Sequence, residues 1–404
     1  MITSALLVCT VFACCFYVAG IASALWHLRR RARSARLAAD TSISLPPLSL
    51  LKPLKGLEEN LDLCLRSFFE QAYPGPLEIV FASAQRDDPA IAVARALALH
   101  YPAVRTRFVL TNESWGLNPK VSNLQGALMA AKHDLVLQTD ANVWAPPSYA
   151  REIVSELLDE SASLLSSLVT GVGERSMGAA IENLQLTAYV APACCAALKL
   201  GGVACVIGKS MLFRKTELRA LGGLELVKDS LAEDFLLGRH FVENGKKVLL
   251  SATPIRNLNV DMRVERSLKR HARWLKMRAV IHPGSFVADF LANPIALASL
   301  AFVASDYRPQ LAYAALAIAA IKTLSDGLMV RVVRGVPMRL QHVLWVPVKD
   351  LLMLGVWVYA IFSRSVEWRG IRFRIGPGSQ LLPDDGNLPA RMLRRVFSVE
   401  TTNG

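Results

Sequence analysis

The sequence predicts an α/β fold flanked by membrane helices, and two observations lead to this prediction. The 404 residues are 52% hydrophobic and only 20% charged, whereas soluble globular domains contain about 25% charged residues. Between residues 45 and 282, apolar runs of strand length alternate with segments of helical spacing. This alternation is typical of βαβ units around a largely parallel sheet. The composition excludes a disordered chain, a collagen-like fibre and a small disulfide scaffold.

The strands and helices of this domain are expected in a regular order. The expected strands are Leu48–Leu51, Leu77–Ala82, Arg107–Thr111, Asp134–Thr139 and Ser163–Thr170. The expected helices are Glu58–Gln71, Pro89–His100 and Pro147–Glu160. Ligands bind beyond the carboxyl ends of parallel strands, so the residues that follow each strand are the candidates for function.

The N-terminal segment predicts a membrane anchor. Ile2 to Trp26 contains no charged residue, and 25 helical residues span about 37 Å, which is enough to cross a bilayer. Five arginines follow between residues 29 and 36. A signal peptide carries its positive charge before a shorter apolar run. Residues 1–27 are therefore expected to anchor the chain, with residue 28 onward in the cytoplasm.

Further apolar stretches predict additional membrane helices over residues 286–362, followed by a basic tail over 363–404. The stretches are Phe286–Ser305, Gln310–Met329 and Val343–Phe362. If the last one spans the bilayer, the tail lies outside against the positive-inside trend; otherwise it dips into one leaflet. The run Tyr189–Ile207 is interrupted by Pro192 and two glycines, which indicates an interfacial or re-entrant element, or a buried core helix.

The charge and the cysteine content limit which ligands, disulfides and metal sites are expected. The 46 basic and 33 acidic side chains give a net charge of +13, which suits an anionic membrane surface or a phosphate-bearing substrate. No nucleic-acid partner is expected, because the arginines gather beside apolar stretches. The seven cysteines are odd in number and form no C-x-x-C pair, so we expect neither a disulfide framework nor a zinc site.

Charged residues occur where the predicted strands end. Asp87 and Asp88 follow the second strand, and Asp140 with Asn142 follows the fourth. A carboxylate with an amide two residues later offers oxygen ligands to Mg²⁺ or Mn²⁺, and such an ion clamps a diphosphate. The alternative roles are a helix cap for the aspartate before Pro89 and a turn former for Asp140.

Two later motifs add a candidate general base and candidate phosphate-binding side chains. Glu233-Asp234 opens a helical run, so one carboxylate is a candidate general base and the other a helix cap. The pattern Arg270-x-x-Arg273-Trp274 can bind phosphate oxygens and stack a ring, or form the solvated face of an interfacial helix. No Walker loop and no G-x-G-x-x-G follows a strand, which disfavours kinases and dehydrogenases.

In their order, these motifs resemble those of the ceramide glucosyltransferase family and its bacterial hopanoid-glycosylating relatives. The matching segments are 52–56, 87–90, 116–123, Asp140, 208–211, Glu233-Asp234 and 270–274, with a tail motif from Trp368 to Arg374. The resemblance covers about residues 1–375. It implies a GT-A nucleotide-diphospho-sugar transferase domain over 45–282, facing the cytoplasm on a multi-pass membrane protein. It further implies inverting transfer of a hexose from a UDP-sugar to a lipid hydroxyl, the acceptor being ceramide, a hopanoid polyol or diacylglycerol.

The resemblance also implies roles for single residues. Asp140 would bind the metal and the diphosphate, and Asp234 would be the catalytic base. Asp87 or Asp88 would contact the nucleotide, and Lys120 would be a further cation of the nucleotide-sugar site.

The segment Arg270, Arg273 and Trp274 would hold the diphosphate and the acceptor. Two positions depart from the family pattern: its first aspartate falls at Gln85, and a His-Pro pair of the animal enzymes falls at Ala191-Pro192.

Two other classes of protein remain possible on these residues. A processive polysaccharide synthase shares similar aspartates, but it needs more membrane helices for a translocation channel. A non-catalytic membrane scaffold with a degenerate transferase domain would not be expected to retain all three carboxylate motifs.

Overall fold

The computed structural model describes residues 1–40, 44–112, 115–368 and 371–383. The chain forms two compact units, and both take residues from the stretch 45–282. The α/β unit comprises Arg33–Ser167, Cys205–Ile255 and Arg364–Gly404. The helical unit comprises Met1–Ala32, Leu168–Ala204 and Arg256–Ser363.

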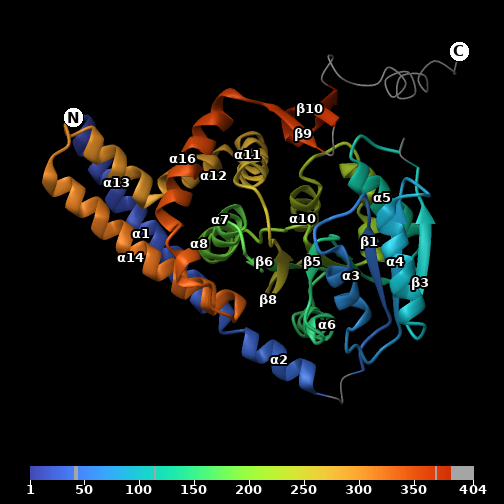
Figure 1. The fold of residues 1–404 in the computed structure, drawn as a ribbon. Coiled ribbons are helices and arrows are strands. Elements are labelled where there is room, and N and C mark those ends of the chain that lie inside the picture. Colours follow the sequence, from blue (N-terminus) through green and yellow to red (C-terminus); the bar gives the residue numbers. More distant parts are fainter. Residues whose placement is uncertain (41–43, 113–114, 369–370, 384–404) are drawn as a thin grey trace, which may run out of the picture. The chain divides into compact units, whose positions relative to one another are not determined.

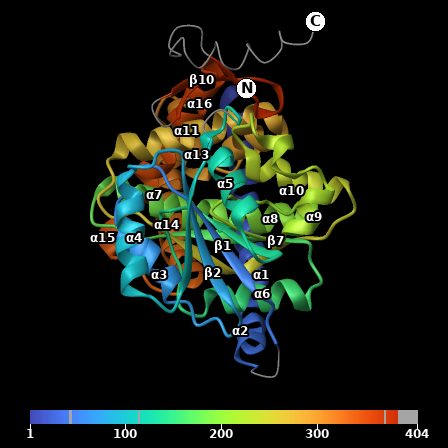
Figure 2. The same ribbon diagram turned by 90° about the vertical axis from the view of Figure 1, so that its right-hand side faces the viewer.

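An eight-stranded sheet among the described residues, ordered β3-β2-β1-β4-β7-β6-β8-β5, forms the centre of the α/β unit (Figures 1 and 2). The last residues of β6 and β8 belong to the helical unit. The strands are β1 Leu48–Pro53, β2 Leu77–Ser83, β3 Arg105–Leu110, β4 Leu135–Thr139, β5 Val143–Trp144, β6 Leu164–Val172, β7 Ser210–Arg214 and β8 Val248–Leu258. The five predicted strands are therefore confirmed, with ends shifted by up to two residues.

The sheet is parallel in one half and mixed in the other. Strand β1 pairs in parallel with β2 and β4, and β2 pairs in parallel with β3. Strand β7 is antiparallel to both β4 and β6. The prediction of a largely parallel sheet is thus wrong beyond β4, because an apolar run has the same side-chain pattern in either chain direction.

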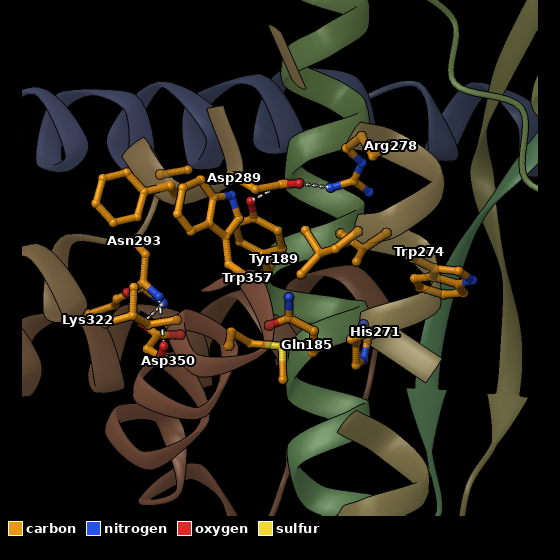
Figure 3. Close-up of a pocket in the computed structure, with 16 residues that line it drawn as sticks. Gln185, Tyr189, His271, Trp274, Arg278, Asp289, Asn293, Lys322, Asp350 and Trp357 are labelled. Carbon is orange, nitrogen blue, oxygen red and sulfur yellow. Dashed lines mark hydrogen bonds and ion pairs between the residues drawn. The ribbon is translucent and has the colours of Figure 1, made fainter. Parts of the chain in front are cut away.

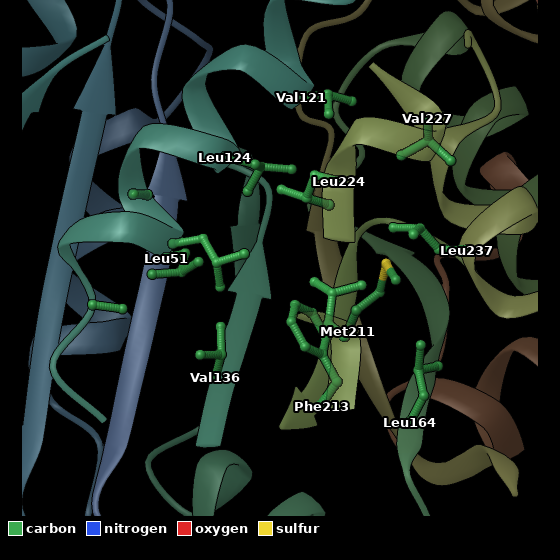
Figure 4. Packing of buried hydrophobic residues seen from close by; sticks show 14 of the residues in the cluster. Leu51, Val121, Leu124, Val136, Leu164, Met211, Phe213, Leu224, Val227 and Leu237 are labelled. Carbon is green, nitrogen blue, oxygen red and sulfur yellow. The ribbon is translucent and has the colours of Figure 1, made fainter. Parts of the chain in front are cut away.

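Helices and a dense apolar core hold the strand ends in place. The α/β unit contains α3 Leu61–Phe69, α4 Pro89–His100, α5 Pro119–Ala130, α6 Tyr149–Asp159, α9 Lys215–Ala220 and α10 Glu233–Glu243, and α2 Arg31–Ala39 begins at the boundary between the units. In Figure 4, Leu124 of α5, Val136 of β4 and Phe213 of β7 belong to one buried cluster, which also contains Leu237 of α10. This packing fixes α5, β4, β7 and α10, the four elements that carry the site described below.

A short segment joins the beginnings of α5 and α10. The side chain of Asn118, the N-cap of α5, donates to the Ser230 carbonyl at 2.7 Å. Its backbone N–H donates to the Lys228 carbonyl at 2.8 Å. A Cβ on Gly116 would lie 2.7 Å from the Lys228 carbonyl oxygen, so only glycine permits this close approach.

The C-terminal strands β9 Ser365–Trp368, β10 Ile371–Ile375 and β11 Leu381–Pro383 form a small antiparallel sheet in the same α/β unit. The N–H of Leu381 donates to the Asp229 carbonyl at 2.8 Å, and that of Leu231 donates to the Ser379 carbonyl at 2.9 Å. The tail thereby supports the segment that leads into α10. Residues 369–370 of the expected tail motif, and 384–404 of the basic tail, lie outside the described residues.

The helical unit is built from long apolar helices. Its helices are α1 Ile2–Leu28, α7 Met177–Leu184, α8 Ala191–Gly201, α11 Val264–Ile281, α12 Pro283–Leu291, α13 Pro294–Val303, α14 Pro309–Arg334, α15 Leu340–Val343 and α16 Val346–Phe362. Helix α1 packs along α13 and α8, and α11 packs along α16 (Figure 1).

Three helices among the described residues have the length and composition to cross a membrane: Ile2–Ala39, Met177–Gly201 and Leu340–Phe362. The pair α12 and α13, bent by 65°, adds a fourth if the two are one span. The helix continues through Pro192, from α7 to α8 by way of a π-helical segment, Gln185–Val190, and it ends at Gly201, where Gly202 is the left-handed C-cap. The predicted break is therefore observed at the two glycines and not at Pro192. A π-helical turn accommodates the missing proline N–H.

Candidate active site

The end of β4 places Asp140 opposite Lys209. Because β4 and β7 are antiparallel with Thr139 paired to Ser210, the next residue on each side also faces its partner. The N–H of Asp140 donates to the Lys209 carbonyl at 3.3 Å. The Lys209 ammonium also lies 3.0 Å from Asp140 Oδ2 and donates to Asn142 Oδ1 at 2.7 Å. The pairing of two strands thus builds one side of the site.

Lys120 lies at the centre of the site. Asn118 caps α5 by accepting from the N–H groups of Lys120 and Val121 at 3.0 and 3.1 Å. The Lys120 ammonium then reaches both Asp140 Oδ1 and Glu233 Oε1 at 2.9 Å. Although burial alone would lower it, the pKa of Lys120 is raised well above its usual value by Asp140 and Glu233. Lys120 is therefore a permanently charged cation held by two carboxylates.

Asp140 is a permanently charged anion because two ammonium groups lie against its carboxylate. Burial alone would raise the pKa of its carboxyl group, but the ammonium groups of Lys120 and Lys209 hold this pKa well below the usual range. A third lysine, Lys52, contacts the same residue. Its side chain is completely buried, and its ammonium donates to the Asp140 backbone carbonyl at 3.1 Å and lies over the Phe68 ring. Burial lowers the pKa of Lys52 well below its usual value, so the fixed cations at the end of β4 are Lys120 and Lys209.

The first turn of α10 carries two carboxyl groups, Glu233 and Asp234, in different environments. Asp234 Oδ2 accepts from the Gly208 N–H at 2.5 Å, and Oδ1 accepts from the N–H of Phe235 at 2.8 Å. Its side chain is partly accessible. Burial, followed by the charge of Glu233, raises the pKa of Asp234 to about 6. This is the value expected of a carboxyl group that accepts a proton near neutral pH.

Glu233 does not have the capping role considered for it. The N-cap of α10 is Ala232, without a side-chain hydrogen bond, and the Glu233 carboxylate binds Lys120 instead. The backbone at Gly208 lies against both charged groups, since a Cβ there would be 2.9 Å from Asp234 Oδ2 and 2.9 Å from the Lys120 ammonium. The residues from α5, β4, β7 and α10 thus form one connected polar network.

The two consecutive aspartates after β2 differ in accessibility. Asp88 is buried and caps α4: its carboxylate accepts from Ala90 N–H at 2.9 Å and from Gly56 N–H at 3.0 Å. The Ser83 hydroxyl donates to the same group at 3.1 Å. Asp87 is exposed. The alternative cap role is therefore observed for Asp88, and Asp87 is the aspartate of this pair that a ligand can reach.

The arginine–tryptophan motif belongs to α11 in the helical unit, not to the unit that contains Asp140. Arg270 pairs with Glu182 at 2.7 Å, where the glutamate side chain is completely buried. His271 binds the other oxygen of Glu182 at 3.0 Å, and its ring meets that of Trp274 edge to face. The structure thus brings Lys120, Asp140 and Asp234 together within one unit and places Arg270, Arg273 and Trp274 in the other.

Both carboxylate oxygens of Asp140 are paired with ammonium groups, Oδ1 with Lys120 and Oδ2 with Lys209, so a metal ion bound there would replace at least one of these contacts. Among the described residues no three His, Cys, Asp or Glu side chains group closely enough to hold a metal by themselves. Mg²⁺ is commonly bound by one or two carboxylates together with substrate phosphates and water. The Asp140 carboxylate and the amide oxygen of Asn142, both in contact with the Lys209 ammonium, supply this type of partial donor set.

The half-parallel sheet, with carboxylates at the end of β4 and at the start of α10, has the architecture of a GT-A nucleotide-diphospho-sugar transferase domain. The family model of glycosyl transferase family 21 matches residues 10–381, so the chain belongs to this family.

Two relatives and one solved structure illustrate the likeness. Ceramide glucosyltransferase 1 of Caenorhabditis elegans is 28% identical over 247 residues, 61% of this chain and 53% of the worm protein. Ceramide glucosyltransferase 3 of the same species is 25% identical over 353 residues, 84% and 75% of the two chains. The chain thus spans about half the length of the first relative. The mannosyltransferase PcManGT from Pyrobaculum calidifontis, solved with GDP-Man and Mn²⁺, is 18% identical with a TM-score of 0.44, over 88% of this chain and 99% of its own.

Proposed function

We propose that this protein transfers a hexose from a UDP-sugar to the hydroxyl group of a membrane lipid, with inversion at the anomeric carbon. The proposal rests on one observation: fixed positive charge and a carboxyl group that can accept a proton lie in the same polar network. Lys120 and Lys209 provide fixed positive charge around Asp140, while Asp234, whose pKa is raised to about 6, lies beside them. A transfer of this kind needs positive charge for the leaving diphosphate and a base for the attacking hydroxyl.

In the proposed reaction Asp234 accepts the proton of the lipid hydroxyl. The hydroxyl oxygen forms a bond to the anomeric carbon while the bond from that carbon to the diphosphate oxygen breaks, which releases UDP. Lys120 and Lys209 stabilise the charge that develops on the diphosphate. Because Glu233 and Asp140 hold the Lys120 ammonium, this cation is already in place before the reaction.

We further propose that Asp140 and Asn142 hold Mg²⁺ or Mn²⁺ together with the diphosphate of the UDP-sugar, since these are oxygen donors at the end of β4. When bound, the ion supplies additional neutralisation of the leaving group. Asp87 is assigned to the nucleotide, because the Asp88 carboxylate is occupied as a helix cap. The diphosphate and acceptor roles of Arg270, Arg273 and Trp274 stay predictions.

The acceptor follows from the family and from the membrane helices. The relatives described above are named ceramide glucosyltransferases, and we propose ceramide, a hopanoid polyol or diacylglycerol as the acceptor. The arginines that follow Trp26 favour a cytoplasmic α/β unit on a multi-pass protein. The C-terminal segment pairs with the segment before α10 in this same unit, which supports placing residues 371–383 on the cytoplasmic side as well.

The test is incubation of the purified full-length protein with radiolabelled UDP-sugars and mixed lipids. UDP-glucose, UDP-galactose, UDP-N-acetylglucosamine and UDP-glucuronic acid are supplied separately. A single labelled glycolipid is expected with one of them. A labelled polymer would support a processive synthase instead, and no turnover by a folded protein would support a scaffold.

A further inference from the structure

Buried polar groups that the proposed reaction does not use occur in both units. In the cavity of the helical unit, charged side chains already pair with one another, as Figure 3 shows for Arg278 and Asp289. In the α/β unit, the completely buried Ser379 of the C-terminal segment (residues 371–383) contacts the start of α10, 147 positions away in the chain. The helix reached by this contact is the one that carries Asp234.

Helix α10 begins without a capping side chain of its own. Its N-cap is Ala232, which is buried and has no side-chain oxygen. The first N–H groups of any helix lack partners within the helix. In a capping box the N-cap N–H is bound by a glutamate at the third helical position, and in α10 that position is Phe235. Because a buried N–H group needs an acceptor, the acceptor for Ala232 comes from another part of the chain.

Ser379 supplies this acceptor. The Ala232 N–H donates to the Ser379 hydroxyl oxygen at 3.2 Å, and the N–H of the preceding residue, Leu231, donates to the Ser379 carbonyl at 2.9 Å. One residue of the C-terminal segment thus binds two successive N–H groups at the start of α10. Asp234 follows two residues after Ala232, so these contacts fix the backbone from which its carboxyl group extends.

The backbone at Ser379 adopts a conformation that favours glycine. Ser379 has a φ of +63°, directly after Gly378 at +61°, and the Gln380 N–H donates to the Pro377 carbonyl at 3.2 Å across this turn. The left-handed region is unfavourable for residues with a Cβ. Strain of this kind persists where the surrounding structure fixes it, and it is frequent at functional sites. Glycine would relieve the strain but would lose the hydroxyl group that binds α10.

The segment that Ser379 holds also contacts the start of α5. Asp229 Oδ1 accepts from the Leu117 N–H at 2.7 Å, and the Leu381 N–H of the C-terminal segment donates to the Asp229 carbonyl at 2.8 Å. Residues 228–232 are therefore bound both by the C-terminal segment and by the residues that lead into the helix of Lys120. A shift of the C-terminal segment would move the base and this cation relative to each other.

We propose that Ser379 is a positioning residue for the base of the transfer: its hydroxyl and carbonyl groups fix the first turn of α10 and thereby the place of Asp234. This rests on the proposed function, since only a reaction that uses Asp234 responds to the contact. Burial is the main cause of the raised pKa of Asp234. A looser first turn that admits water should therefore lower this pKa towards its ordinary value.

The experiment removes the hydroxyl group and leaves the turn in place. Ser379→Gly suits the left-handed backbone and keeps the carbonyl that binds Leu231, and Ser379→Ala loses the same hydroxyl while keeping the Cβ. Gln380→Ala is the matched control, because the Gln380 side chain is exposed in the same turn. Amide hydrogen exchange over residues 230–238 is measured for each full-length protein. The kcat, the KM for the UDP-sugar and the pH dependence of kcat/KM are measured with the sugar and lipid that the wild type uses.

Both Ser379 variants are expected to exchange roughly tenfold faster over residues 230–238, as for the loss of one buried hydrogen bond. Their kcat should fall roughly tenfold because the base is misplaced, while the KM for the UDP-sugar should change by less than about twofold. The pH at which kcat/KM is half its maximum should lie below that of the wild type. A smaller folded fraction alone would lower kcat/KM equally at every pH. Gln380→Ala should match the wild type in each measurement.

Unchanged exchange, or faster exchange with an unchanged kcat and pH profile, would overturn the proposal. A loss confined to Ser379→Gly would also overturn it, since the flexibility of glycine and not the missing hydroxyl would then be responsible. If the wild type transfers no sugar to any lipid, the proposed function fails. The exchange rates of the two Ser379 variants then decide by themselves whether Ser379 holds the start of α10.

Discussion

Replacing Asp234 by asparagine tests the assignment of the base. The change keeps the shape of the side chain but removes its ability to take a proton. In the wild-type protein the Asp234 carboxylate accepts from two backbone N–H groups, those of Gly208 and Phe235. Asparagine can replace one of these acceptors, so the expected loss of stability is about 1 kcal/mol. A general base contributes 10²–10⁴-fold to the rate, so kcat should fall by about 10²-fold or more.

The assay measures UDP release for kcat and calorimetric titration for UDP-sugar affinity, which should change little because Asp234 acts in the transition state. Glu233→Gln is the matched control: it removes the neighbouring carboxylate, while Asp140 still holds the Lys120 ammonium. Its loss of kcat should be much smaller. If Asp234→Asn retains most of its turnover and Glu233→Gln does not, the roles of the two carboxyl groups are reversed.

Four further outcomes are expected. Because the pKa of Asp234 is raised to about 6 and only its ionised form accepts a proton, kcat/KM should fall as pH drops below 6; a flat profile between pH 5 and 7 would contradict this. Asp140→Ala should abolish turnover and the effect of Mg²⁺ or Mn²⁺ on UDP-sugar binding, measured by titration with and without EDTA. Gly208→Ala should fold but lose roughly 10-fold or more in kcat, because its Cβ would lie 2.9 Å from Asp234 Oδ2 and would displace this carboxylate. Phe213→Ala, in the core, should lower the free energy of unfolding by about 3–5 kcal/mol. Leu99→Ala, on the surface, should change it by less than about 0.5 kcal/mol in denaturant titrations.

Local sequence patterns predict the parallel half of the sheet well. The run Leu77–Ala82 becomes β2, and Pro89–His100 becomes α4 with the same ends, because a strand-length apolar run and an Asp-Pro helix start are signals contained within a few residues. Strand β7 was not among the predicted strands, and its antiparallel direction depends on partners about 45 and 75 residues away in the chain. Such pairing is a property of the folded chain and not of the segment.

The site shows the same division between local and distant information. Asp140 and Asp234 are recognisable because each stands at the end of a strand or the start of a helix. Lys209 precedes β7 without a local signal that distinguishes it from a solvated loop lysine, yet its ammonium binds Asp140 across two strands. The partnership of Lys120 with Glu233 joins residues more than 100 positions apart. No spacing rule within the sequence indicates that pairing.

The central claim is a single displacement with Asp234 as the base. It is tested most directly by the anomeric configuration of the glycolipid, determined by proton NMR on the product made from an α-linked UDP-sugar. A β-linked product alone is predicted, because one in-line displacement inverts the anomeric carbon. An α-linked product would contradict the account, since it requires a different mechanism from attack by a hydroxyl that Asp234 deprotonates.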